Sequence, residues 1–199
     1  MANWAYLAVS DESRIYPSFQ NPSFDTKKHW VLASAGCVPL LWLALFSEAD
    51  LVSVGFQDKE GPLQAFAPVT TLAGSLKRIA QRGPFLNELL ASNGGVAHHL
   101  GLFADYLAAQ DGRYVTMLVD EIECLYEKGM FNELLRSALR GLDNRDPEVV
   151  APLVELSTIM LERRFVTLAE ANAGAYERED MSNYFRIMGE GYIQRPPWE

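Results

Sequence analysis

The stretch VPLLWLALFSEADLVSVGFQDKEGPLQAFAPV, residues 38–69, contains the two kinds of element that decide the fold. Its first part is apolar nearly all round after Pro39, a residue suited to the first position of a helix, and this predicts a helix buried in the core. Two runs rich in β-formers follow, Leu51–Asp58 and Leu63–Val69, and the turn formers in the KEGP segment between them predict a hairpin. A buried helix followed by a hairpin indicates a fold of the α+β class.

The segments around this stretch extend the same fold. Trp4–Asp11 is rich in β-formers and ends in turn residues, so we expect an opening strand that joins the hairpin in a small N-terminal sheet, antiparallel or mixed. Residues 12–30 contain two prolines and no helical period, which predicts a loop, whereas residues 113–120 fit either a strand or the start of a helix. Apolar periodicity and capping residues predict helices over 70–82, 84–92, 96–109, 130–144 and 147–160, with breaks at Gly83 and Pro84 and a cap at Asp146.

Length and composition favour one folded unit. A chain of 199 residues fits a single core, and 49% hydrophobic with 22% charged residues is typical of a globular domain. We therefore expect one helix-rich domain over residues 1–199, with a sheet-containing part at 1–69 and a mainly helical part at 70–199.

The net charge limits the class of partner. A formal charge of -9 and a pI near 4.9 argue against nucleic acid, which is held by clustered Lys and Arg side chains. The same charge accelerates association with a basic protein through long-range attraction.

Membrane and export signals are not expected. The start MANWAYLAVSDES carries no positive charge before an apolar region, and the longest apolar run, at 37–46, is far shorter than the roughly 20 residues that span a bilayer. Cys37 and Cys124 lie among apolar residues without C-x-x-C spacing, which suits buried thiols in a reducing cytoplasm, although a disulfide between them stays open.

The segment VDEIECLYE, residues 119–127, is the densest group of ionisable side chains. On a helix, Asp120, Glu123, Cys124 and Glu127 would share one face. Three interpretations stay open: a metal or acid–base cluster, a solvated helix face, and an acidic ridge that meets a partner. No His lies nearby in sequence and no D-x-D loop is present, so the solvated face is favoured and the metal cluster is the weakest.

Motifs for catalysis or cofactor binding are absent from the sequence. His98 and His99 are adjacent, so a helix would point them about 100° apart, which does not suit a shared zinc ion. There is no G-x-S-x-G, Walker or G-x-G-x-x-G motif, and Cys37 lacks an evident base. We expect no catalytic residues, no metal, no cofactor and no small-molecule ligand.

Aromatic residues in polar surroundings are candidates for a binding surface. Tyr16, Phe19 and Phe24 lie in the predicted loop, and the final segment contains Tyr184, Phe185, Tyr192 and Trp198. Aromatic side chains dominate interface energetics, but the same residues can tether a loop or tail to the core.

Three segments, MANWAYLAVSD, VPLLWLALFSE and LVSVGF, together resemble a family of small cytoplasmic bacterial proteins encoded beside contact-delivered toxins. Within it, the chain resembles immunity proteins of type VI secretion system nuclease effectors that bear a GHH-type DNase domain. The resemblance covers roughly the first third of the chain, and its motifs are structural, so no active-site residues carry over. It implies a cytoplasmic, non-enzymatic inhibitor that binds and neutralises its cognate nuclease toxin domain.

These observations together yield a set of expected toxin-binding residues: Asp120, Glu123, Glu127, Asp105, Asp111, Tyr16 and Phe19. Two alternatives remain, a metal-dependent hydrolase that uses the carboxylates at 120–127 and a regulatory adaptor for a partner other than a toxin.

Overall fold

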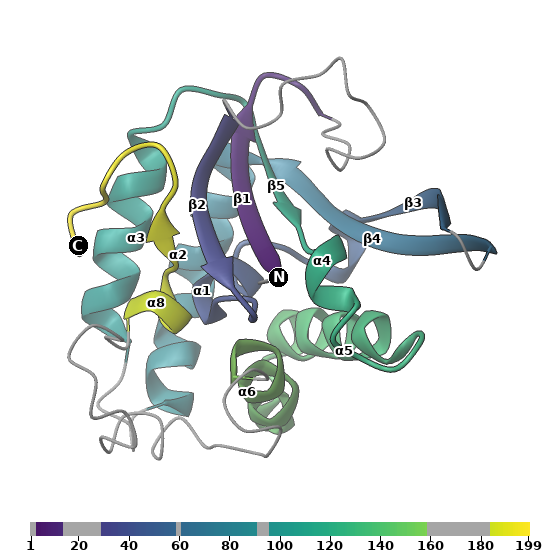
Figure 1. The fold of residues 1–199 in the computed structure, drawn as a ribbon. Helices are drawn as coiled ribbons and strands as arrows, with labels where there is room; N and C mark the ends of the chain where they lie inside the picture. Colours follow the sequence, from purple (N-terminus) through teal and green to yellow (C-terminus); the bar gives the residue numbers. More distant parts are fainter. Residues whose placement is uncertain (1–2, 14–28, 59–60, 91–95, 159–183) are drawn as a thin grey trace, which may run out of the picture.

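The centre of the molecule is a six-stranded antiparallel sheet in the order β3-β4-β5-β1-β2-β6, with helices behind it and at one end (Figure 1). It is seen in a computed structural model that describes residues 3–13, 29–58, 61–90, 96–158 and 184–199. The strands are β1 (Trp4–Ser10), β2 (Trp30–Ala35), β3 (Leu51–Asp58), β4 (Gly61–Thr71), β5 (Tyr114–Leu118) and β6 (Glu190–Gly191).

The α+β class, the opening strand and the hairpin are confirmed, but the prediction that the sheet is confined to the N-terminal part is wrong. The segment 113–120, for which a strand and a helix start were both predicted, contains the strand β5, and β5 lies between β4 and β1. Its residues from Val115 to Leu118 are all buried, so the segment lacks the alternation that marks a half-exposed strand. β2 begins at the end of the predicted loop, and β6 has only two residues, too few for a sequence signal.

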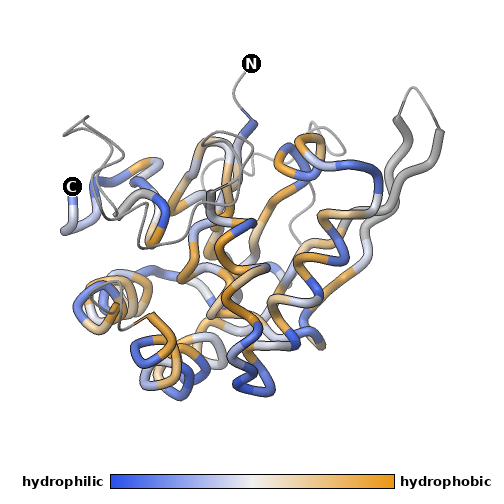
Figure 2. Tube along the Cα trace, turned by 90° about the horizontal axis from the view of Figure 1, so that it is seen from below, coloured by the Kyte–Doolittle hydropathy of each residue, from blue (hydrophilic) through white to orange (hydrophobic). Residues whose placement is uncertain are grey.

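The two faces of the sheet have different partners. Along β1, Ala5, Leu7 and Val9 point into the main core with the helices, because successive side chains of a strand alternate between faces. Tyr6 and Ala8 point the other way and form a small second cluster, together with Trp30 and Leu118. Hydrophobic segments gather where the helices face the sheet, and hydrophilic segments lie mainly on outer turns (Figure 2).

The helical elements are α1 (Leu40–Leu43), η2 (Glu48–Asp50), α2 (Leu72–Leu89), α3 (Ala97–Ala108), α4 (Asp120–Glu123), α5 (Met130–Asn144), η4 (Pro147–Val149), α6 (Val150–Thr158) and α8 (Tyr184–Ile187). The predicted helix at 130–144 and the Asp146 cap are confirmed, the Asp146 carboxylate accepting the Glu148 N–H at 3.0 Å. In the described part of the chain, no helix has the length and apolar character needed to cross a bilayer.

The predicted break between two helices at Gly83 and Pro84 is wrong, because α2 runs through both residues. Proline removes one hydrogen-bond donor and normally disrupts a helix interior. Here Arg82 and Leu86, on either side of Pro84, are both buried, so tertiary packing holds the helix together across the proline.

The apolar run after Pro39 is buried as predicted, but only Leu40–Leu43 is helical. The chain then turns, and its next carbonyl groups accept hydrogen bonds from side chains of α2. Arg82 Nη1 donates to the carbonyl oxygens of Ala44 (2.9 Å) and Phe46 (2.6 Å), and Arg78 Nη1 donates to that of Leu45 (2.6 Å). These arginines replace the helical bonds that the run would otherwise have made.

Arg82 also connects this turn to α5. Only 4% of Arg82 is exposed, and its Nη2 forms an ion pair with Asp143 at 2.5 Å. The second oxygen of Asp143 accepts the backbone N–H of Glu48 at 3.1 Å. Burial lowers the pKa of Arg82, and the nearby Asp143 carboxylate opposes that shift. A single guanidinium therefore joins α2, α5 and the turn after α1.

The segment around β6 is anchored from behind the sheet. The indole Nε1 of Trp42, a fully buried residue, donates to the carbonyl oxygen of Met188 at 2.8 Å. Gly189 follows with φ of +84°, and a Cβ placed there would lie 2.7 Å from the Trp42 ring. Trp198 donates to the Gly189 carbonyl oxygen at 2.9 Å and packs against Tyr106, so this aromatic residue tethers the segment to α3.

Replacing Arg82 with Met should lower the free energy of unfolding by about 3–5 kcal/mol, because Asp143 and two buried carbonyl groups lose their donor. Urea unfolding followed by far-UV circular dichroism measures the change. The matched control is Arg140→Met, since the ion pair of Arg140 with Glu48 is on the surface, with 57% of the Arg140 side chain exposed. Equal effects of the two substitutions would contradict the role assigned to Arg82.

Gly189→Ala should destabilise the protein by about 2–4 kcal/mol, because the new methyl group meets Trp42 and the backbone is left-handed there. Gly101→Ala is the control, since a Cβ at this helical position of α3 meets no atom within 4 Å. Gly101→Ala should instead raise the free energy of unfolding by about 0.5–1 kcal/mol. Thermal unfolding of both variants tests the pair, and a neutral Gly189→Ala would contradict the packing described.

Candidate functional site

The predicted acidic ridge is replaced by a single helical turn. α4 covers only Asp120–Glu123 and starts directly after β5, with Ile122 fully buried. The chain then continues in turns to Gly129, whose φ is +83°. Asp120, Glu123, Cys124 and Glu127 therefore do not share one continuous helix face, because the next N–H groups, of Leu125 and Tyr126, bond three residues back, to Ile122 and Glu123, as in turns.

The carboxylates of α4 lie in partly desolvated positions. Burial raises the pKa of Asp120 to about 6, and the neighbouring Glu121 carboxylate adds to the shift, while a bond from the Asp120 backbone N–H opposes it. Burial also raises the pKa of Glu123, which accepts a hydrogen bond from Asn132 Nδ2 at 2.9 Å. Glu121 is exposed, and its Oε2 accepts the backbone N–H of Trp4 at 2.9 Å.

No ion pair between described residues neutralises these carboxylates. The four ion pairs found there join Arg78 to Asp50, Arg82 to Asp143, and Arg136 and Arg140 to Glu48. A carboxylate that is partly desolvated without a cation destabilises the fold, and groups held in this way are enriched at functional sites. α4 therefore presents carboxylates that accept hydrogen bonds from Asn132 and Trp4 but form no ion pair with a cation of the described residues.

Aromatic rings lie next to α4 on the outer face of the sheet. Tyr6 stacks on Trp30 with a centroid distance of 3.6 Å, and Trp4 lies 6.4 Å from Tyr6 in a nearly parallel plane. Tyr192, 39% exposed, meets both Tyr6 and Trp30 edge-on. Burial raises the pKa of Tyr6 to about 12, with further contributions from Glu121, Tyr192 and Asp120, so the carboxylates are in electrostatic reach of this ring.

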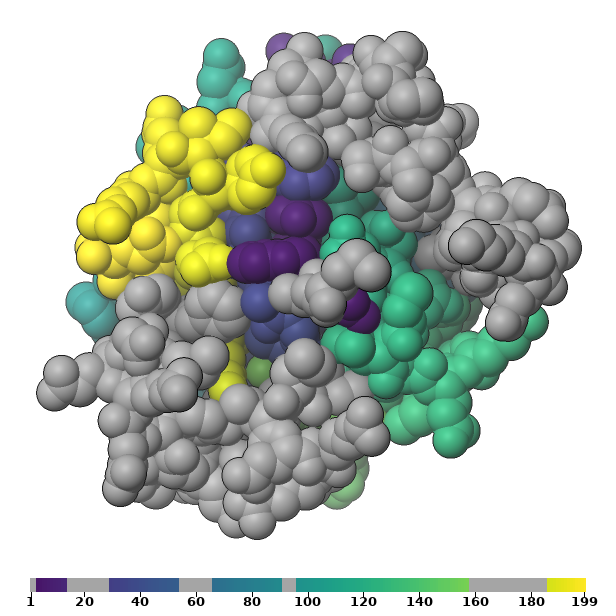
Figure 3. Space-filling model, in the orientation of Figure 1, coloured from purple at the N-terminus to yellow at the C-terminus, as the bar shows by residue number. Residues whose placement is uncertain are grey.

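We call this region the aromatic–acidic surface and define it by Trp4, Tyr6, Tyr192, Asp120, Glu121 and Glu123. In the space-filling view, the purple N-terminal strand emerges at the centre of the face, between the yellow C-terminal segment and the green region of α4 and α5 (Figure 3). Three separate parts of the sequence thus meet at one place.

The other residues expected to bind a partner are dispersed or not described. Asp105 is exposed on α3, and Asp111 is exposed in the turn before β5. Asp120 follows the other end of β5, and five strand residues span roughly 17 Å. Glu127 is exposed in the turn after α4. Tyr16 and Phe19 lie outside the described residues.

Sequence reasoning missed Trp4, Tyr6 and Glu121 as site residues. The signal for the first two was present, because aromatic residues two positions apart on the predicted opening strand must share a face. That this face is the one opposite the helices, and that α4 lies beside it, follows only from the pairing of β1 with β5.

The cysteine and histidine side chains in the described ranges do not form a second site. Cys37 is buried as predicted, but the expected burial of Cys124 is wrong, since it is exposed just after α4, and neither thiol is part of a disulfide. His98 and His99 have ring centroids 5.9 Å apart, and burial lowers the pKa of His99. Within the described ranges, no group of three or more His, Cys, Asp or Glu residues is placed to hold a metal ion.

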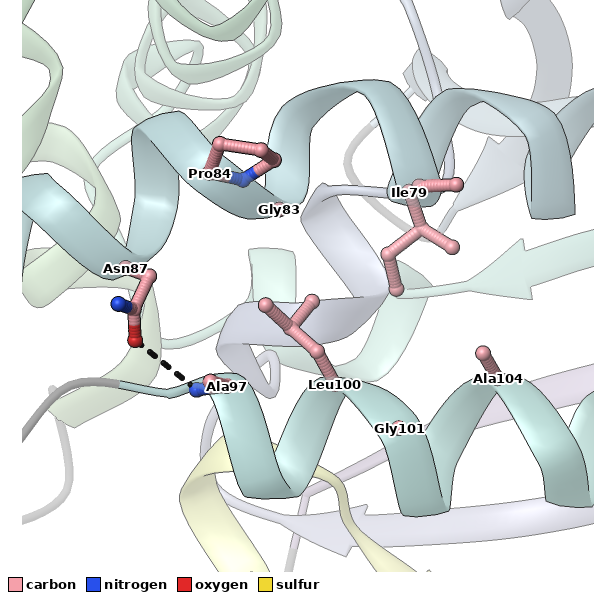
Figure 4. Close-up of a pocket in the computed structure, with 9 residues that line it drawn as sticks. Ile79, Gly83, Pro84, Asn87, Ala97, Leu100, Gly101 and Ala104 are labelled. Carbon is pink, nitrogen blue, oxygen red and sulfur yellow. Dashed lines mark hydrogen bonds between the residues drawn. The ribbon is translucent and has the colours of Figure 1, made fainter.

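A groove of about 420 Å³ lies between α2 and α3 (Figure 4). Its lining includes Ile79, Gly83, Pro84 and Leu100 but no ionisable side chain. The Asn87 side-chain oxygen at its end already accepts the N–H groups of Val96 and Ala97, both at 3.0 Å. The groove therefore offers an apolar surface without a catalytic group.

No protein-family model, curated protein or solved structure matches the chain.

Asp120→Asn should stabilise the protein at neutral pH. The pKa of Asp120 is higher in the folded state than its ordinary value of 3.8. The resulting contribution to protein stability is therefore fully present below pH 3.8 and is lost as the pH rises through about 6. The free energy of unfolding of the variant should therefore equal that of the wild type near pH 3.5 and exceed it by up to about 3 kcal/mol at pH 7.5. Urea unfolding at both pH values measures this.

The control for this prediction is Glu127→Gln, at an exposed position in the turn that follows α4. Exposed substitutions usually change stability by less than about 0.5 kcal/mol, at either pH. A pH-independent effect of Asp120→Asn would refute the assignment of a partly desolvated carboxylate.

Proposed function

We propose that the protein is a cytoplasmic immunity protein that binds and neutralises a nuclease toxin delivered by a type VI secretion system, without catalysis of its own. The observation that carries this proposal is the aromatic–acidic surface, where carboxylates without a described counter-cation lie beside partly exposed aromatic rings. The resemblance of the first third of the chain to such immunity proteins supports the choice of partner.

The electrostatics suit a nuclease as partner. A domain that holds DNA must carry clustered Lys and Arg side chains to neutralise phosphates. A chain with a net charge of -9 attracts such a domain over long distances, and this raises the association rate. The same charge opposes binding of the protein itself to nucleic acid.

The aromatic rings supply the short-range part of the interaction. Tyrosine and tryptophan are enriched among the residues that contribute most to interface affinity, especially when surrounded by groups that exclude water. Trp4 and Tyr6 are partly exposed, Tyr192 is 39% exposed, and Trp30 behind them is buried. The Trp30 ring contacts those of Tyr6 and Tyr192, and this restricts both side chains, which lowers the entropy lost on binding.

The aromatic–acidic surface contains only some of the residues that the sequence predicted to bind a toxin. Asp120 and Glu123 belong to it and Glu127 follows in the next turn, whereas Asp105 and Asp111 lie elsewhere. A metal-dependent hydrolase is less well supported. Among the described residues, the carboxylates at 120–127 do not belong to any group of three or more side chains that could hold a metal ion. A regulatory adaptor would use the same surface, so only the identity of the partner separates it from an immunity protein.

Expression of the neighbouring open reading frame should be toxic to cells, and co-expression of this protein should rescue growth. Glu121→Lys with Glu127→Lys should reduce rescue and slow association of the purified proteins at least tenfold at low salt, because both positions are exposed near α4. The slowing should shrink as salt screens the charges.

The matched control combines Asp105→Lys with Asp111→Lys, which changes the net charge by the same amount at exposed positions away from α4. It should retain most of the rescue and most of the association rate. Absence of rescue by the wild-type protein would exclude the immunity function, and equal losses in both double variants would exclude the α4 region as the binding site.

A further inference from the structure

Three aromatic rings on the outer face of the sheet lie in nearly parallel planes, but they are not evenly spaced. Tyr6 and Trp30 have centroids 3.6 Å apart and planes inclined by 22°, which is direct stacking contact. Trp4 and Tyr6 have centroids 6.4 Å apart and planes inclined by 17°. Tyr6 is thus in direct contact with the buried Trp30 ring, whereas its centroid is farther from that of Trp4; we call the Trp4–Tyr6 pair a step.

The width of this step follows from the strand. Trp4 and Tyr6 are two residues apart on β1, and that repeat is about 6.6 Å along a strand. Both rings are partly exposed, and their planes are nearly parallel. The Trp4–Tyr6 step therefore offers neighbouring aromatic faces on which one planar group can stack.

The step is bordered by negative charge. Glu121 reaches it by accepting the backbone N–H of Trp4 at 2.9 Å, which leaves its other oxygen without a bond to a described residue. Asp120 and Glu121 both act electrostatically on the Tyr6 hydroxyl, so carboxylates lie near the same ring. None of the ion pairs between described residues involves either carboxylate.

We propose that the Trp4–Tyr6 step binds the guanidinium group of an arginine side chain that projects from a basic protein partner, with the group against the two rings and its N–H groups toward Glu121 and Asp120. This inference rests on the proposed function and specifies the chemistry by which the partner is recognised.

Arginine fits the step better than other cations. Its guanidinium is planar, stacks on aromatic faces and is weakly hydrated, and its five N–H donors match carboxylates in a fork geometry. A lysine ammonium is compact and strongly hydrated, so it gains the charge attraction but not the stacking. A phosphate or a nucleobase attached to phosphates is repelled by the carboxylates.

The direct test uses two capped peptides of the same length, one with two arginines and one with two lysines, titrated into the full-length protein by calorimetry at low salt. The arginine peptide should bind at least fivefold more tightly. Trp4→Ala should remove this preference, and Glu121→Gln should weaken the arginine peptide at least threefold while its side-chain oxygen can still accept the Trp4 N–H. Asp105→Asn, which removes one exposed charge on α3, should leave the preference unchanged.

Equal affinity for the two peptides would overturn the proposal, as would a preference that survives in Trp4→Ala or an affinity for the arginine peptide that is unchanged in Glu121→Gln. Far-UV circular dichroism of each variant confirms that it is folded, and Glu121→Gln provides the test if Trp4→Ala does not fold.

The outcome is separable from that of the growth-rescue experiment. If the wild type rescues growth but shows no arginine preference, the Trp4–Tyr6 step is excluded and the immunity function stands. If the wild type shows the preference and does not rescue, the immunity function is excluded and the step remains a site for arginine on another basic protein.

Discussion

The fold depends on one buried guanidinium. Arg82 satisfies carbonyl groups of a chain that leaves its helix after four residues, and it pairs with Asp143 on a helix far along the sequence. Without that donor, the apolar run after Pro39 would have to continue as a helix or leave polar groups unsatisfied in the core. Since η2 and β3 follow directly from this turn, the arginine also determines where the hairpin begins.

The carboxylates on α4 differ from Arg82 in having no ion-pair partner among the described residues. Arg82 is buried with two carbonyl groups and a carboxylate as partners, whereas Asp120 and Glu123 are partly desolvated and form no ion pair with a described cation. Partly desolvated charges of this kind are enriched at functional sites. The two regions therefore differ in that the charge of Arg82 has a counter-ion within the described fold, whereas the carboxylates of α4 have none.

Local signals in the sequence predicted those elements whose structure is determined locally. The helix at 130–144 has a strong apolar stripe, and Asp146 with Pro147 is a recognisable helix start. The sequence left β5 undecided between strand and helix and did not predict β6, because β5 pairs with β1 and β4 and β6 pairs with β2, all distant in sequence. Likewise, α2 continues through Pro84 only because buried residues on both sides hold it. For the site, residue types identified Asp120 and Glu123, but the meeting of Trp4 and Tyr6 with α4 required the register of β1 against β5.

The bond from Trp42 to Met188 joins residues 146 positions apart. During synthesis, the segment that contains Met188 has to be made before the buried Trp42 indole can reach its hydrogen-bond acceptor. This part of the core therefore forms only after most of the chain has left the ribosome.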